Sequence, residues 1–171
     1  MPTGYWQARK HLAYYGAVRE ELEALSPGGS LLDVGGWDTE VVQWGTFARR
    51  YTCDLGRDPG FPGVVAHVGD FLEWPLPERM SVTTCCQVLE HMDLDTARRF
   101  AAKLLAGTDV LIITVPHQWP PREPSHILDP IDLPKLASIV RYHPLRHRII
   151  ADGKRERLVA IYDTRRLGRR A

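Results

Sequence analysis

Apolar residues near the start of the chain recur every three or four positions, a spacing that predicts a helix over residues 5–25. The apolar face of this helix consists of Leu12, Tyr15, Val18, Leu22 and Leu25. The sequence Ser26-Pro27-Gly28-Gly29 predicts its end. A similar pattern predicts an amphipathic helix over residues 93–106, and shorter helices are indicated over 38–49 and 131–141.

Short apolar runs between these helices are typical of strands. They occupy residues 30–35, 51–54, 64–68, 81–88 and 110–115, followed by 145–151 and 157–162. The last two are joined by a turn that contains Asp152-Gly153-Lys154, which is typical of a β-hairpin. Strands that alternate with helices form a mostly parallel sheet with helices on its faces, and an antiparallel last strand is common there. The pattern therefore predicts an α/β fold.

Length, composition and charge narrow the class of protein. The 171 residues fit one domain, and 44% apolar with 25% charged residues is ordinary globular composition. The formal net charge of +1 argues against the phosphate backbone of DNA as the main partner. We find no signal-peptide pattern and no apolar run near the roughly 18 residues that span a bilayer. We therefore expect no membrane partner. Three cysteines, two of them adjacent, do not form a disulfide framework, so we expect a cytoplasmic protein.

Candidate chemistry lies at the carboxyl ends of the predicted strands, where open α/β sheets bind ligands. Gly35 and Gly36 follow the first strand and allow a tight turn with close approach of a ligand. Asp54 ends the second strand, where a carboxylate can accept hydrogen bonds from both ribose hydroxyls. Asp70 and Phe71 follow the third strand and suit an adenine, because the acid accepts from the amine while the ring packs on the base. Each feature also has a purely structural interpretation as a turn, a strand end or a helix cap.

Five sequence stretches at these strand ends resemble a known family. They are SLLDVGG (30–36), YTCDLG (51–56), HVGDFLEWPLP (67–77), VTTCCQVLEHM (82–92) and VLIITVP (110–116). In this order and at about this spacing, they resemble the class I S-adenosylmethionine-dependent methyltransferases of the small-molecule type. The resemblance implies a Rossmann-like, doubly wound, mostly parallel seven-stranded sheet with an antiparallel last strand, in three layers (α/β/α). It also implies a cofactor half at 30–116, after an N-terminal helix (1–27) and before an acceptor loop and terminal hairpin (117–171).

The resemblance also assigns roles in binding S-adenosylmethionine and its product S-adenosylhomocysteine. It places Asp33, Gly35 and Gly36 around the methionine moiety, Asp54 at the ribose, Asp70 and Phe71 beside the adenine, and Gln87 near the sulfonium, with Trp37 and Leu55 completing the site. In the family's Asp-x-Gly-x-Gly-x-Gly loop, Trp37 and Thr39 replace the second and third glycines. A positive φ is harder for Trp37, so we expect the loop to take another path. The alternative nicotinamide cofactor requires G-x-G-x-x-G, which Gly-Gly-Trp-Asp-Thr-Glu at 35–40 does not provide.

The acceptor side is predicted on the proline-rich stretch 116–130, which would form a stiff loop. His117 and His126 are the candidate general bases, and His91 and Trp119 the candidate acceptor contacts, although structural roles are common for histidines. Glu90 has two interpretations, a helix N-terminal residue favoured by the helix dipole or a catalytic acid. We expect no metal site, because Gln87 and His117 stand where a metal-dependent methyltransferase would have carboxylates.

Three classes of function follow from these residues. The first is methyl transfer to a small molecule or a peptide side chain, in a short enzyme that either has an open site or is completed by a homo-oligomer or a partner subunit. The second is a non-catalytic methyltransferase-like binding or scaffold protein, and a nicotinamide oxidoreductase is a third. DNA is not expected as a substrate, because Gln87-Val88-Leu89-Glu90 stands where amino-methylating nucleic-acid enzymes of this fold carry [Asn/Asp/Ser]-Pro-Pro-[Tyr/Phe].

Overall fold

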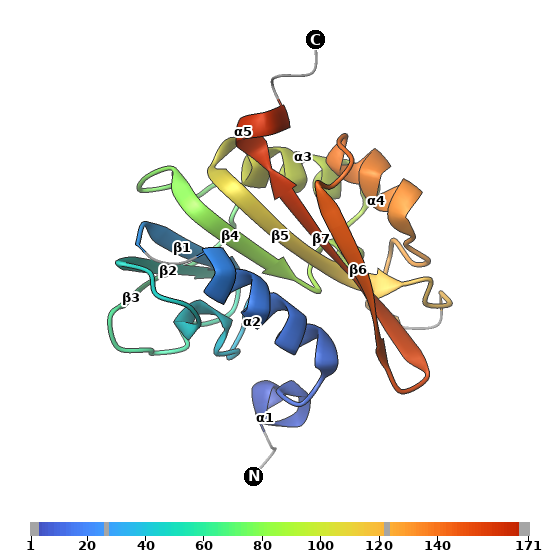
Figure 1. Ribbon diagram of the computed structural model, residues 1–171, viewed down its shortest axis with the longest axis horizontal. Helices are drawn as coiled ribbons and strands as arrows, with labels where there is room; N and C mark the ends of the chain where they lie inside the picture. Colours follow the sequence, from blue (N-terminus) through green and yellow to red (C-terminus); the bar gives the residue numbers. More distant parts are fainter. Residues whose placement is uncertain (1–3, 26–27, 122–123, 168–171) are drawn as a thin grey trace.

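The centre of the molecule is a seven-stranded sheet, shown in a computed structural model that describes residues 4–25, 28–121 and 124–167 (Figure 1). The strand order is β3-β2-β1-β4-β5-β7-β6. The strands are β1 (Ser30–Val34), β2 (Arg49–Asp54), β3 (Val64–Val68), β4 (Met80–Cys86), β5 (Thr108–His117), β6 (Arg146–Asp152) and β7 (Arg155–Asp163). β1 to β5 pair in parallel, and β7 is antiparallel to both of its neighbours. The predicted fold class is confirmed, including the antiparallel last strand.

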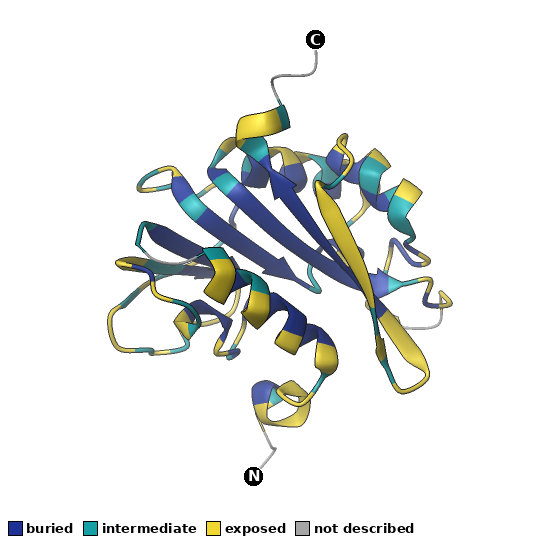
Figure 2. Ribbon diagram, viewed as in Figure 1, coloured by how far each residue is buried: buried dark blue, intermediate teal, exposed yellow. Residues whose placement is uncertain are grey.

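Helices cover both faces of this sheet and complete three layers (Figures 1 and 2). The helices are α1 (Tyr5–Arg9), α2 (Ala13–Leu25), α3 (Leu94–Ala106), α4 (Leu133–Val140) and α5 (Thr164–Leu167), with 3-10 turns η1 (Val41–Gln43) and η2 (Leu89–His91). Successive strand residues face opposite sides, so Leu31 packs with α1 and α2 whereas Leu32 packs with α3 and α4. None of the described helices has the length and apolar character needed to cross a membrane.

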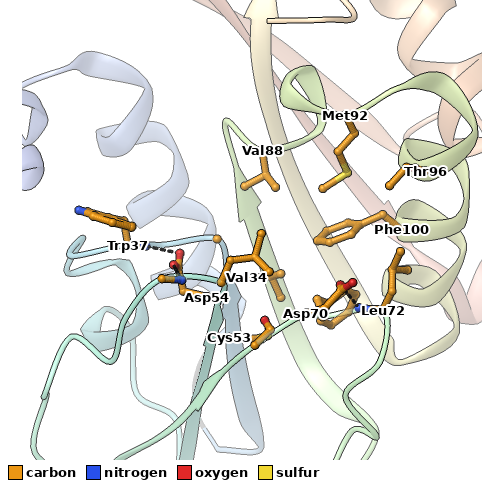
Figure 3. A pocket seen from close by; sticks show the side chains of 15 residues that line it. Val34, Trp37, Cys53, Asp54, Asp70, Leu72, Val88, Met92, Thr96 and Phe100 are labelled. Carbon is orange, nitrogen blue, oxygen red and sulfur yellow. Dashed lines mark hydrogen bonds between the residues drawn. The ribbon is translucent and has the colours of Figure 1, made fainter. Parts of the chain in front are cut away.

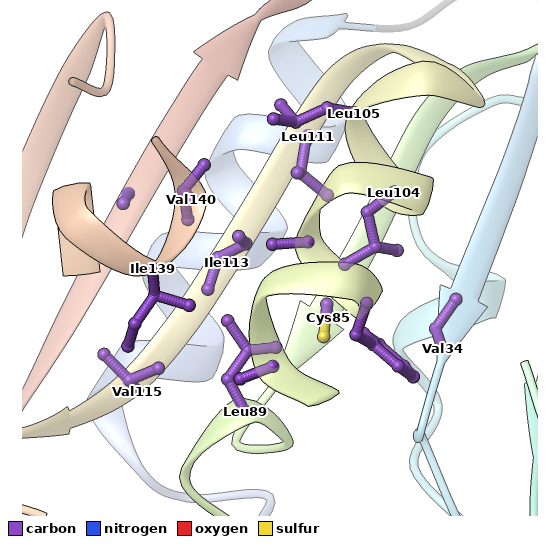
Figure 4. Packing of buried hydrophobic residues seen from close by; sticks show 14 of the residues in the cluster. Val34, Cys85, Leu89, Leu104, Leu105, Leu111, Ile113, Val115, Ile139 and Val140 are labelled. Atoms are coloured by element: carbon purple, nitrogen blue, oxygen red, sulfur yellow. The ribbon is translucent and has the colours of Figure 1, made fainter. Parts of the chain in front are cut away.

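The larger core lies between the sheet and helices α3 and α4 (Figure 4). Helix α3 has the predicted amphipathic pattern and begins at Asp93, whose carboxylate accepts hydrogen bonds from the backbone N–H groups of Asp95 and Thr96, both at 3.0 Å. Leu104 of α3 and Ile139 of α4 are buried in this core with Ile113 of β5. The packing holds the carboxyl ends of β4 and β5 in a fixed position.

The predicted helix over residues 5–25 is interrupted between Arg9 and Ala13, so this prediction is wrong in its middle. The break allows α1 to turn and bury Trp6, whose ring meets Tyr15 edge-on at a centroid distance of 5.0 Å. The backbone N–H of Trp6 donates a hydrogen bond to the carboxylate of Asp38 at 3.0 Å. Helix α2 then starts afresh, with the N–H of Ala13 donating to Asp152 of the terminal hairpin. The predicted stop at Ser26 and Pro27 lies outside the described residues.

The predicted helix over residues 38–49 is also wrong, because only the short turn η1 forms there. The physical reason is a competing set of hydrogen bonds. The guanidinium group of Arg50 donates to the backbone carbonyls of Val42, Trp44 and Gly45 at 2.5, 3.0 and 2.7 Å. Gly45 has a positive φ of 66°, which directs the chain away from a helix.

Candidate active site

A cavity of about 520 Å³ opens where β1, β2, β3 and β4 end at the same edge of the sheet (Figure 3). Six of the nine residues that the sequence assigns to the cofactor line it: Gly35, Trp37, Asp54, Leu55, Asp70 and Phe71. The remaining wall comes mostly from residues that sequence reasoning did not single out, among them Cys53, Val88, Met92, Thr96 and Phe100. Thr96 and Phe100 are four residues apart on α3 and therefore face the cavity together. This shared face could have been predicted from the helical periodicity of the sequence.

Asp54 joins two loops at the rim of the cavity. Its carboxylate accepts a hydrogen bond from the backbone N–H of Trp37 at 3.0 Å and another from Gly56 at 2.8 Å. The two bonds use different oxygens, and each oxygen retains acceptor capacity. Asp54 is therefore held in one orientation and can still accept hydrogen bonds from a ligand in the cavity.

Trp37 adopts a backbone conformation that non-glycine residues rarely take. Its φ is 56°, so the loop does not avoid a positive φ at this position, in contrast to our expectation of a different path. The left-handed conformation costs roughly 1–2 kcal/mol for a residue with a Cβ. The hydrogen bond to Asp54 offsets part of this cost. Trp37 is 44% exposed, and its indole ring passes so close to Gly56 that a Cβ on Gly56 would lie 2.6 Å from the ring.

The other side of the cavity is formed by Asp70 and Phe71 together with α3. The ring of Phe71 is buried against Phe100, with ring centroids 4.8 Å apart. Asp70 accepts a hydrogen bond from the backbone N–H of Leu72 at 2.8 Å, so it stabilises the turn after β3. The structural interpretation of Asp70 is therefore realised, and its carboxylate also lines the cavity. The result is an apolar cavity with carboxylates on opposite sides, as Figure 3 shows.

The three other residues assigned to the cofactor lie behind the cavity wall. Asp33 is buried beneath the loop after β1 and accepts hydrogen bonds from the hydroxyls of Thr84 (2.6 Å) and Thr39 (3.4 Å). Gly36 packs directly against it, because a Cβ on Gly36 would lie 2.1 Å from an Asp33 oxygen. Gln87 has a φ of 56° and its amide donates to Thr114 of β5 at 3.1 Å. These residues shape the loops but do not line the cavity.

Because Asp33 is buried, the stability of the protein depends on pH through the ionisation of its carboxyl group. Burial raises the pKa of its carboxyl to about 6, with the Asp54 charge adding to the effect and the two threonine hydroxyls opposing it. A raised folded-state pKa contributes stability that is present below the unfolded value, near 4, and lost as the pH rises through about 6. We expect the Asp33→Asn variant to gain about 3 kcal/mol relative to the wild type between pH 4 and pH 7. Urea unfolding across this range measures the difference, and a constant difference would contradict the assignment.

The candidate acceptor residues form two groups. His117 and Trp119 line a second cavity beyond the end of β5, beside the terminal hairpin. His117 Nδ1 lies 2.9 Å from a carboxylate oxygen of Glu156, and Trp119 Nε1 donates to the backbone carbonyl of Glu156 at 2.8 Å. The hairpin therefore fixes the orientation of both rings.

The second group contains His91 and His126, whose ring centroids are 4.8 Å apart. His126 also stacks on Trp119 at 5.7 Å, so Trp119 connects the two groups. Glu90 belongs to this cluster. It stands in the first turn of η2, so it is N-terminal in this short 3-10 turn and not in α3, and its side chain is fully buried. Burial raises the pKa of the Glu90 carboxyl to about 8.

Comparison with solved structures defines the class of fold. The chain has the fold of the class I S-adenosylmethionine-dependent methyltransferases, whereas no protein-family model and no curated protein sequence matches it significantly. One similar structure is the 1,6-didemethyltoxoflavin-N1-methyltransferase of Burkholderia thailandensis, with 1,6-didemethyltoxoflavin and S-adenosylhomocysteine bound. Its TM-score is 0.74 at 17% identity, over 90% of this chain and 79% of that one.

Two further structures share the fold. The N-methyltransferase NodS of Bradyrhizobium japonicum WM9, in complex with S-adenosylhomocysteine, has a TM-score of 0.72 at 10% identity, over 94% of this chain and 88% of that one. The magnesium protoporphyrin IX methyltransferase of Synechocystis PCC 6803, with S-adenosylhomocysteine bound, has a TM-score of 0.65 at 15% identity, over 94% of this chain and 88% of that one. At these identities the likeness establishes the fold, while the chemistry must be argued from the site.

Proposed function

We propose that this chain is an S-adenosylmethionine-dependent methyltransferase that acts on a small molecule or a peptide side chain. The observation that carries the proposal is the cavity at the carboxyl ends of the strands, with the oriented carboxylate of Asp54 at its rim. This is the place where open α/β sheets bind their ligands. The similar structures that contain S-adenosylhomocysteine support the same conclusion.

The cavity suits a nucleoside with an apolar middle and hydrogen-bonding ends. In our proposal, Asp54 accepts hydrogen bonds from the ribose hydroxyls, and Asp70 with Phe71 flanks the adenine. Leu55, which is 77% exposed at the rim, would cover the sugar. Gly35 and Trp37 would surround the methionine end, on the loop that Asp33 and Gly36 support from below, with Gln87 beyond it.

The bound cofactor would supply a methyl group attached to a positively charged sulfur. The thioether that departs is a good leaving group, so the methyl group is already activated for transfer. The protein then needs to align the acceptor and exclude water. In our proposal, His91 and Trp119 contact the acceptor, and His117 or His126 takes its proton. In both candidate bases Nδ1 is held by a carboxylate, at 2.9 Å from Glu156 and 2.6 Å from Asp129, which leaves Nε2 to accept the proton.

A thermal melt tests the proposal directly. At about 100 times its dissociation constant, a ligand stabilises the folded state by about 2.7 kcal/mol, which for this chain length raises the Tm by roughly 5–11 °C. We expect this shift with S-adenosylmethionine and with S-adenosylhomocysteine, and none with NAD.

The other outcomes separate the alternatives. A shift with NAD alone would favour an oxidoreductase, and no shift with any of the three ligands would contradict the proposed cofactor site. A shift with both adenosyl ligands, followed by no transfer of labelled methyl groups to any acceptor in a broad metabolite and peptide panel, would favour a binding or scaffold protein.

A further inference from the structure

A cluster of ligand-type side chains lies next to the cavity, on the connection between β4 and α3. Glu90 and His91 belong to η2, between Val88 and Met92, which line the cavity wall. His126 comes from the distant proline-rich loop. The loop is fastened there because the backbone N–H groups at 127 and 128 both donate to the carbonyl of Glu90, at 2.7 and 3.2 Å.

Glu90 is the unusual member of this cluster. Its side chain is completely buried, and neither carboxylate oxygen has a hydrogen-bond partner among the described residues. A buried carboxyl group without hydrogen-bond partners is costly, and native structures rarely leave one unsatisfied. One of its oxygens lies 4.0 Å from His91 Nε2. The carboxyl group therefore faces the cluster, and no hydrogen bond from the described residues satisfies it.

Both histidines are arranged as metal-binding histidines commonly are. His91 Nδ1 lies 2.8 Å from the backbone carbonyl of Ser125, and His126 Nδ1 lies 2.6 Å from the carboxylate of Asp129, which is itself buried. Such contacts fix the tautomer with the proton on Nδ1 and leave Nε2 with a free electron pair. One ligand atom from each of Glu90, His91 and His126 lies within 4.8 Å of the other two. A zinc ion bound by all three atoms at roughly 2.0–2.2 Å would draw them closer to one another than they are here.

We propose that Glu90, His91 and His126 bind a divalent first-row transition-metal ion, with Zn²⁺ as the best-matched ion. Two imidazoles and one carboxylate form a donor set suited to such ions and leave coordination positions open for water or a ligand. The proposal replaces our sequence-based expectation of no metal. It also makes His91 and His126 metal ligands, which leaves Trp119 as the candidate acceptor contact and His117 as the candidate base. It does not depend on the proposed methyl transfer.

The surroundings of the cluster permit an ion to enter and to stay. The His91 side chain is 44% exposed, so the site is open to solvent on that side, whereas Glu90 closes it from within. Two charged groups act on the Glu90 carboxyl, the negative Asp129 and, with a smaller effect, the positive Arg157. Its guanidinium is paired with Asp152 at 3.1 Å, which reduces its opposition to a second cation.

The test measures metal binding by the full chain without cofactor or acceptor, so its result is separate from that of the methyltransferase proposal. The protein is treated with EDTA, freed of the chelator and titrated with Zn²⁺, Mn²⁺ and Mg²⁺ in a calorimeter, and the bound ion is counted by elemental analysis. We expect one Zn²⁺ per chain, with Mg²⁺ bound far more weakly because imidazole is a poor ligand for it. Absence of stoichiometric binding of Zn²⁺ and Mn²⁺ would overturn the proposal.

Variants locate the ion. We expect His91→Ala, at an exposed position that should not disturb folding, to weaken Zn²⁺ binding at least 100-fold, and Glu90→Gln to do the same at nearly constant side-chain volume. Asp129→Asn should weaken it about 10- to 100-fold, because the residue acts through His126. The matched control is His143→Ala, which removes an exposed histidine outside the cluster and should leave binding unchanged. Equal binding by the wild type and His91→Ala would overturn the assignment.

Discussion

Replacing Asp54 with alanine is expected to weaken the binding of S-adenosylmethionine about 10- to 150-fold. The estimate corresponds to the loss of a charge-assisted hydrogen bond to the ribose, worth about 1.5–3 kcal/mol. The geometry supports a large effect, because the carboxylate is already fixed by the N–H groups of Trp37 and Gly56 and needs no reorganisation to receive a ligand. Isothermal calorimetry with S-adenosylhomocysteine, which does not react, measures the affinity.

Asp54 also supports the loops, so its role in binding must be separated from its role in folding. Asp54→Asn retains an acceptor for one of the two backbone N–H groups and should preserve most of the stability while losing the charge that the ribose hydroxyls meet. The control is Asp58→Ala, four residues along, where the exposed carboxylate accepts a hydrogen bond from the Gly60 N–H at 2.7 Å. An unchanged affinity in Asp54→Ala and Asp54→Asn would contradict the cofactor site.

The part of this site that could be predicted from the sequence is the part set by strand ends. Asp54 and Asp70 follow parallel strands, so the sheet alone brings them to one edge, and the structure has both on the cavity. The position of Glu90 could not be fixed from the sequence, because the chain between β4 and α3 forms a separate 3-10 turn before the helix begins. The contact of His126 with Glu90 depends on backbone hydrogen bonds from a long loop, which no periodicity reveals.

In the fold as well, elements set by local sequence patterns could be predicted, whereas elements changed by tertiary contacts could not. Helix α3 follows its apolar spacing and its Asp93 cap closely, because both signals are local. The segment 38–49 also has apolar residues, but Arg50 binds three carbonyls that a helix would need, and that contact is a property of the folded chain. In a similar way, β4 ends at Cys86 and not at residue 88, because Gln87 turns into the left-handed region.

Replacing Arg157 with methionine is expected to destabilise the protein by about 3–5 kcal/mol, because it leaves a buried partner charge uncompensated. The side chains of Arg157 and Asp152 are 10% and 8% exposed and lie 3.1 Å apart. The Arg157 guanidinium also lies 4.8 Å from the ring centroid of Tyr14 and 5.0 Å from that of Trp119. The residue thus connects the terminal hairpin, helix α2 and the acceptor segment. For a chain of this length, the Tm should fall by about 6–20 °C.

Two further variants show whether the buried charge pair is the cause. Arg155→Met makes the same substitution two residues away at an exposed position, where the guanidinium lies 4.2 Å from the Trp119 ring, and it should cost less than about 1 kcal/mol. Adding Asp152→Asn to Arg157→Met removes the orphaned charge and should recover part of the lost stability, as a double-mutant cycle measures. A loss below about 1 kcal/mol in Arg157→Met, or no recovery in the double variant, would contradict this account.

The Arg157→Met variant should also increase local opening of the acceptor segment, because the Arg157 guanidinium packs on the ring of Trp119. We therefore expect the rate of amide hydrogen exchange to rise more in residues 117–121 than in β1.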